Sequence, residues 1–119
     1  MTDRYRVVAD WKAAYEDPIT LETKDVVLLN GKTDTWEGHL WVWARNSNGK
    51  EGWIPDTLIE TVDGEHFARD RFSAVELTCN VGEILVGLDE THGWILCRSR
   101  TGSEGWVPAR NLKPASDVG

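Results

Sequence analysis

The chain has 119 residues and a formal net charge of −7, with seven basic and eleven acidic residues in 1–62 and six basic and nine acidic residues in 63–119. Such an even acidic distribution builds no basic face, which excludes the usual surface of a protein that binds nucleic acid or anionic membranes. The two cysteines have no Cys-x-x-Cys spacing, which argues against a disulfide scaffold and a structural zinc site. The acidic surface suits basic ligands, although solubility alone also accounts for it.

The first residues lack the apolar run of a signal peptide, and no stretch is long and apolar enough to span a bilayer. We therefore expect a cytoplasmic protein. Short runs of β-branched residues, bounded by turn residues, predict strands in the first half of the chain. These strands are expected at residues 7–9, 19–21, 26–29, 40–45, 51–55 and 58–60.

The connections in the first half follow from their turn residues. Pro18 ends an irregular loop that begins at Asp10, because proline disfavours a central strand. A polar loop is expected over residues 30–39, with Trp36 inside it. Asn48-Gly49 is the strongest hairpin signal in the chain, since both residues tolerate positive φ.

A four-residue motif occurs twice, as Gly52-Trp53-Ile54-Pro55 and as Gly105-Trp106-Val107-Pro108. Another tryptophan precedes the motif tryptophan by twelve residues in both copies, at Trp41 and at Trp94. This regularity indicates an internal duplication. We divide the chain into two domains, 1–61 and 62–119, joined by a short polar connector over residues 61–66.

The second half repeats the first at two offsets. Residues 77–79 match 19–21 at an offset of 58, and residues 94–98 match 41–45 at an offset of 53, so the first copy carries five additional residues in the loop with Trp36. Short strands with regular turns and no convincing helix are typical of small barrels. The sequence therefore predicts an all-β protein of two tandem small β-barrels with about five strands each.

Several stretches of the second half resemble the SH3 domain. Residues 68–72, Ala-Arg-Asp-Arg-Phe, stand where that family has Ala-Leu-Tyr-Asp-Tyr, and residues 76–83 stand where it has Glu-Leu-Ser-Phe-x-x-Gly-Asp. Gly93-Trp94 and the Gly-Trp-Val-Pro motif match the family's third and fourth strands. The first half matches from about Val8 to Ile59, and the whole is most similar to bacterial variants of the fold.

The resemblance implies a module that binds peptide segments in an aromatic groove, with proline-rich or basic segments as the candidate ligands. It places Trp41, Pro55, Trp11 and Trp53 at the groove of the first repeat, and Trp94, Pro108 and Phe72 at the groove of the second. Trp106 is a further candidate contact, although Trp53 and Trp106 could instead simply cover the barrel edge. Acidic residues at the loops could pair with a basic ligand side chain, namely Glu16, Asp17 and Glu76. The aromatic ladder of the family is incomplete at four positions: Ala13, Leu58, Asp70 and Asn111. The identity of the ligand therefore stays open.

Strand alternation separates the core from the surface. If Ala44 fills the core, then Trp41 and Trp43 point outward together, and either could contact a ligand or the other repeat. Cys97 stands at the position of Ala44, and Cys79 at that of Leu21, so both thiols are expected in the core; a redox pair requires that their β-carbons lie close together.

No arrangement of residues suggests catalysis, a cofactor or a metal ion. The sequence holds no nucleophile elbow and no phosphate-binding glycine loop, and His39 and His92 supply only one histidine per loop. We expect a non-enzymatic protein-interaction module. The alternative is a structural protein that forms oligomers or docks as a subunit of a larger assembly.

Overall fold

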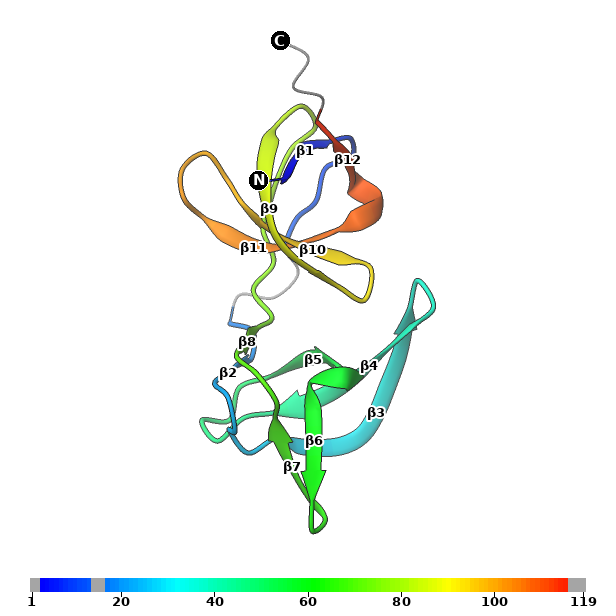
Figure 1. Cartoon of the computed structure of the whole chain (residues 1–119), viewed down its shortest axis with the longest axis vertical. Coiled ribbons are helices and arrows are strands. Elements are labelled where there is room, and N and C mark those ends of the chain that lie inside the picture. The colour runs from blue at the N-terminus through cyan, green and yellow to red at the C-terminus, as the bar shows by residue number, and fades with distance from the viewer. Residues whose placement is uncertain (1–2, 14–16, 116–119) are drawn as a thin grey trace. The chain divides into compact units, whose positions relative to one another are not determined.

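The computed structural model describes residues 3–13 and 17–115, which form two compact units (Figure 1). Unit 1 contains residues 3–13 and 76–115, and unit 2 contains residues 17–75. Strands make up both units, together with two 3-10 turns, η1 (Asp56–Leu58) and η2 (Ala109–Asn111). The predicted all-β class is confirmed.

Unit 1 is built on one antiparallel sheet of five strands in the order β11-β10-β9-β1-β12. Its strands are β1 (Asp3–Val7), β9 (Ile84–Thr91), β10 (Trp94–Arg98), β11 (Glu104–Pro108) and β12 (Leu112–Pro114). The strand β1 pairs with β9 on one side and with β12 on the other, so a segment from the first repeat lies inside this sheet.

Unit 2 contains a three-stranded sheet, β3-β4-β5, and two pairs, β6-β7 and β2-β8. Its strands are β2 (Thr20–Leu21), β3 (Leu28–Trp36), β4 (His39–Arg45), β5 (Glu51–Pro55), β6 (Ile59–Val62), β7 (Glu65–Ala68) and β8 (Phe72–Ser73). A bridge between Val26 and Phe67 joins β7 to the residues that precede β3.

The compact units do not coincide with the sequence repeats. The strands β7 and β8 belong to the second repeat but lie in unit 2, whereas β1 belongs to the first repeat but lies in unit 1. Each unit therefore combines strands of one repeat with the first strand of the other repeat. Unit 1 contains β1 of the first repeat, and unit 2 contains β7 of the second. The boundary predicted between residues 61 and 62 describes the duplication, and the units of the structure are composed differently.

A tight turn explains the exchange. Asp63 and Gly64 both have positive φ, 51° and 81°, which is the geometry of a two-residue hairpin turn. This turn folds β7 back onto β6, with Val62 opposite Glu65. The predicted connector over residues 61–66 is thus wrong: it is a hairpin, and Asp-Gly was the signal for it.

The loop predicted over residues 30–39 is likewise mostly strand. The strand β3 continues to Trp36 and turns into β4 at Glu37-Gly38. Two residue pairs, Thr35 with Leu40 and Trp36 with His39, extend this hairpin beyond the pair Asp34–Trp41, whereas β9 and β10 end at the pair Thr91–Trp94. These pairs account for four of the five additional residues, and a larger bulge in β3 accounts for the fifth.

Each unit has its own hydrophobic core. The core of unit 1 includes Val7, Cys97 and Val107, and that of unit 2 includes Ala44, Ile54 and Ala68. Ile54 and Val107, which follow the tryptophan in the two copies of the repeated motif, are fully buried. No helix among the described residues is long and apolar enough to cross a membrane.

Candidate functional site

In unit 1, two tryptophans from different repeats meet. The ring of Trp11 packs edge-on against the ring of Trp94, with centroids 5.4 Å apart and planes at 80°. The backbone of Trp11 is held by reciprocal hydrogen bonds with Cys79, of 2.9 and 2.8 Å. Its indole Nε1–H donates to Oε1 of Glu76 at 3.0 Å. Trp11 is therefore fixed at both its backbone and its side chain.

The resemblance grouped Trp11 with Trp41 and Phe72 with Trp94, and the structure exchanges these partners. Trp11 lies against Trp94 in unit 1, while Phe72 packs on the core of unit 2. The reason is the strand exchange, which carries the first aromatic position of each repeat into the unit of the other. The pairs Trp94–Pro108 and Trp41–Pro55 lie in register on neighbouring strands.

In unit 2, the outward face of β4 and β5 carries tryptophans. Trp43 lies opposite Trp53, with ring centroids 5.2 Å apart and planes at 77°. Trp41 and Trp43 share one face of β4 because side chains alternate along a strand. Ala44 lies on the opposite face and is 1% exposed, so the tryptophans are on the outward face. The predicted outward direction of Trp41 and Trp43 is confirmed.

A cation lies over this tryptophan pair. The Nζ of Lys32 is 4.9 Å from the ring centroid of Trp43 and 5.4 Å from that of Trp53. No feature of the sequence singles out Lys32, which falls within the loop predicted over residues 30–39. Its position depends on the bulge in β3.

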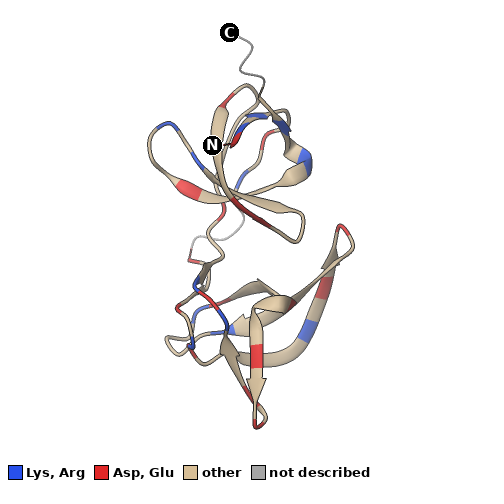
Figure 2. Cartoon of the chain, in the orientation of Figure 1, with Lys and Arg blue, Asp and Glu red and all other residues tan. Residues whose placement is uncertain are grey.

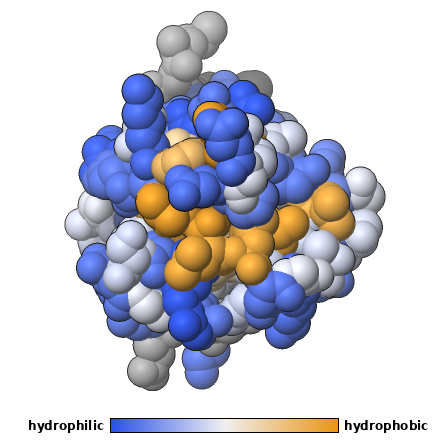
Figure 3. All heavy atoms as spheres, turned by 90° about the horizontal axis from the view of Figure 1, so that it is seen from below, coloured by the Kyte–Doolittle hydropathy of each residue, from blue (hydrophilic) through white to orange (hydrophobic). Residues whose placement is uncertain are grey.

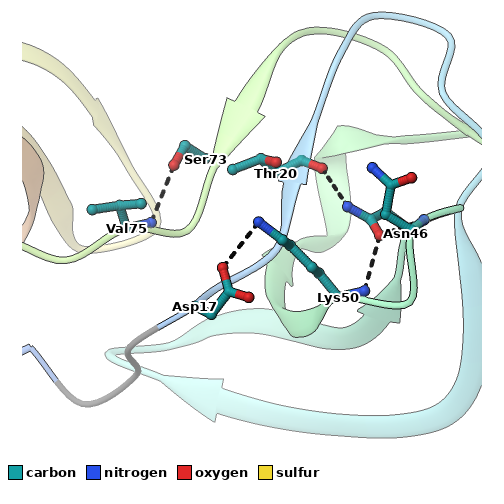
Figure 4. Close-up of polar contacts among 7 residues, drawn as sticks. Asp17, Thr20, Asn46, Lys50, Ser73 and Val75 are labelled. Atoms are coloured by element: carbon teal, nitrogen blue, oxygen red, sulfur yellow. Dashed lines mark hydrogen bonds and ion pairs between the residues drawn. The ribbon is translucent and has the colours of Figure 1, made fainter.

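Two of the acidic residues predicted to meet a ligand, Asp17 and Glu76, have partners within their own unit. Asp17 Oδ1 lies 2.9 Å from the Nζ of Lys50, an exposed ion pair shown in Figure 4. Figure 4 also shows Asn46 holding the neighbouring turn: its Nδ2 donates to the carbonyl of Thr20, and its Oδ1 accepts the N–H of Lys50. Glu76 accepts a hydrogen bond from the indole N–H of Trp11. Glu16 lies outside the described residues.

The remaining predicted contact residues differ in exposure. Trp106 is 8% exposed, and Pro108 is fully buried. Pro55 is also buried, while Trp41, Trp53 and Trp94 are half-buried. The half-buried rings are thus the ones that present indole surface, and the two buried prolines lie opposite Trp41 and Trp94 on the neighbouring strands.

The two cysteines are free and buried, at 1% and 0% exposure for Cys79 and Cys97, as predicted for core thiols. Burial raises the pKa of the Cys97 thiol to about 12, and the nearby Cys79 contributes. Burial likewise raises the pKa of Cys79. Since the thiolate is the reactive form, both groups are poor nucleophiles.

Charged residues are interspersed over both units (Figure 2), while apolar side chains gather on the face seen in Figure 3. In unit 2 the exposed apolar residues include Val26, Leu28 and Val62, at 44, 55 and 49%. Val26 bridges to the half-buried Phe67 on β7. We call these four residues the apolar patch of unit 2.

Comparison with known proteins agrees with the repeat. The family model of the variant SH3 domain matches residues 4–62 and again residues 66–115. The chain is also similar to the mouse SH3 and PX domain-containing protein 2B, with 26% identity over 131 aligned positions that cover 96% of this chain. The chain spans 14% of the length of that relative.

Proposed function

Because the chain belongs to the variant SH3 domain family, whose members are generally protein-interaction modules, we propose that it binds an extended segment of a partner protein at its half-buried tryptophans. The binding surfaces are centred on Trp94 with Trp11 in unit 1 and on Trp41 with Pro55 in unit 2. The module is non-enzymatic and acts in the cytoplasm. The contact between Trp11 and Trp94 carries this proposal.

That contact supports binding because it is preorganised. Trp11 is tied to Cys79 and Glu76, so the aromatic surface loses little conformational freedom when a ligand arrives. Indole rings offer a large flat area for an extended chain, and a polyproline-type segment adds little entropy cost of its own. The net charge of −7 favours a basic segment over an acidic one and a protein over a nucleic acid.

The test compares the whole chain with Trp94→Ala and Trp41→Ala in capture from a lysate, followed by titration of synthetic peptides from the captured protein. We expect each substitution to remove its own set of partners, with peptide affinity reduced at least tenfold, since buried aromatic anchors contribute about 2 kcal/mol or more. Thermal melting checks that each variant is folded.

Trp11→Phe is the matched control for unit 1, because it keeps a ring against Trp94 but removes the indole that Glu76 holds. An intermediate loss of affinity is expected from it. Partner lists that are the same for the whole chain and for folded Trp94→Ala and Trp41→Ala would refute the proposal.

The second candidate is self-association or docking as a subunit, which the apolar patch of unit 2 favours, since large exposed apolar areas often mark interfaces. Sedimentation of the purified chain tests it. A dimer that Leu28→Glu converts to a monomer would support this function, and a monomer at high concentration would exclude self-association.

A further inference from the structure

The outward face of unit 2 already holds a cation, the ammonium group of Lys32. Two indole rings, Trp43 and Trp53, stand nearly perpendicular, and the ammonium of Lys32 lies within 5.4 Å of both centroids. An ammonium over an indole face is attracted by the negative potential of the ring, and tryptophan is the strongest such partner among the aromatic residues. Two rings around one ammonium make a two-walled cation site.

A carboxylate fixes this site. Trp43 donates its Nε1–H to Oε2 of Glu51 at 2.7 Å, and Oε1 of Glu51 accepts from Arg45 at 3.1 Å. These hydrogen bonds, that of Trp43 first and then that of Arg45, lower the pKa of Glu51. Glu51 therefore remains charged, orients the ring of Trp43 and adds negative charge beside the ammonium.

The backbone shows how Lys32 reaches the rings. The pairing of β3 with β4 shifts register between Leu29 and Thr33, and Gly31 within this bulge has φ of 86°. A bulge redirects a side chain that regular pairing would place elsewhere. Lys32 itself is exposed, so its long side chain is held mainly by the rings and exchanges easily with solvent.

We propose that the Trp43–Trp53 pair is a binding site for a lysine side chain of a basic partner segment, and that Lys32 occupies this site as an internal competitor. The inference rests on the proposed function, because it assigns a ligand chemistry to one surface of the interaction module. Binding replaces one ammonium by another, so the incoming lysine gains what the leaving Lys32 gives up, plus the contacts of the segment that carries it.

The second repeat supplies a natural comparison. Arg98 and Glu104 form an ion pair of 2.9 Å, at the positions that correspond to Arg45 and Glu51, whose ion pair measures 3.1 Å. Leu96 stands at the position of Trp43, however, and pairs with the buried Trp106. Unit 1 therefore has the carboxylate and one indole, whereas unit 2 has the carboxylate and two indoles. The substitution Trp43→Leu gives unit 2 the same set of side chains as unit 1 at these positions.

The experiment is an NMR titration of the whole chain, in low salt, with the probe peptide acetyl-Gly-Lys-Gly-amide, followed through the indole N–H signals. We expect the signals of Trp43 and Trp53 to shift. In Lys32→Ala the affinity should rise about two- to fivefold, the factor that corresponds to removing a competing exposed cation–π contact of about 0.5–1 kcal/mol. Lys32→Arg retains a competing cation and should stay near the original affinity.

Two controls make the result specific. The norleucine analogue of the peptide lacks the charge and should leave both signals unmoved, and Trp43→Leu should abolish the response without unfolding unit 2. Peptides with arginine or trimethyllysine in place of lysine rank the cations that the site accepts. Shifts confined to the arginine peptide would overturn the assignment to lysine.

The inference is also overturned if Lys32→Ala leaves the affinity unchanged, or if the norleucine peptide binds as well as the lysine peptide. Either outcome is distinguishable from failure of the proposed function. Partners that are captured equally by the whole chain, Lys32→Ala and Trp43→Leu, but lost in Trp94→Ala and Trp41→Ala, would leave the interaction module in place without this cation site.

Discussion

Gly52 and Gly105 occupy the same position of the repeated motif, and neither has room for a side chain. A β-carbon at Gly105 would lie 2.6 Å from the backbone of Glu76 and Leu77, whereas one at Gly52 would lie 2.9 Å from Cγ2 of Ile19. A side chain can shift more readily than a backbone. The two glycines are therefore required for space, to unequal degrees.

We expect Gly105→Ala to lower the free energy of unfolding by about 3 kcal/mol and Gly52→Ala by about 1 kcal/mol, in the range measured for overpacked sites. Urea-induced unfolding followed by tryptophan fluorescence measures both. Equal losses, or a larger loss for Gly52→Ala, would contradict the close contact of β11 with the chain at Glu76.

Cys97 should make stability depend on alkaline pH. Burial raises the pKa of its thiol to about 12, whereas an unfolded cysteine has a pKa of about 8.5. The folded state therefore keeps a proton that the unfolded state loses. The resulting stability is complete below about pH 8.5 and is lost as the pH rises toward 12, with a slope of up to about 1.4 kcal/mol per pH unit.

Urea-induced unfolding at pH 7.5, 9 and 10 checks this expectation. Cys97→Ala is the matched variant because Ala44 fills the same position in the core of unit 2. Its slope between pH 9 and 10 should be shallower than that of the original chain, with the remainder due to Cys79, whose pKa is also raised. Identical slopes would contradict the burial of the Cys97 thiol.

At the scale of elements, the turn between β6 and β7 decides which strand completes unit 2. Asp63 and Gly64 adopt positive φ, a conformation that residues with a side chain enter at a cost of about 1–2 kcal/mol. We expect Gly64→Ala to reduce the free energy of unfolding of unit 2 by that amount, measured by urea denaturation of a fragment with residues 17–75. Asp63→Asn should be neutral, because asparagine tolerates the same conformation; a neutral Gly64→Ala would contradict the turn.

At the scale of the whole molecule, strand exchange predicts which fragments fold. Residues 17–75 hold all of the buried core of unit 2, including Ala68 on β7. A fragment of residues 1–61 lacks β7 and instead carries β1, which in the structure pairs with β9 and β12 of unit 1. We therefore expect 17–75 to melt cooperatively and to be the more stable fragment.

Circular dichroism melting and amide NMR dispersion of the two fragments make this comparison. If the domains divide at residue 61 instead, fragment 1–61 will be the stable one. Fragment 17–75 will then be unfolded, because it lacks β1. The full chain serves as the reference for both.

Local sequence determined a great deal about this protein. The repeated Gly-Trp-Ile/Val-Pro motif indicated the duplication. The core position of Ala44 and the outward direction of Trp41 and Trp43 follow from strand periodicity, which depends only on neighbouring residues. The family resemblance rests on the same patterns and is confirmed by the match of both repeats.

The tertiary structure alone decided which segments meet. The strands β1 and β7 each pair with strands far away in the chain or in the other repeat, so periodicity could not tell that Trp11 lies against Trp94 and not beside Trp41. Lys32 reached Trp43 and Trp53 through a bulge that depends on how β3 and β4 pair. Strand pairing joins residues far apart in the chain, and its energy depends on all the partners available, which a local pattern does not contain.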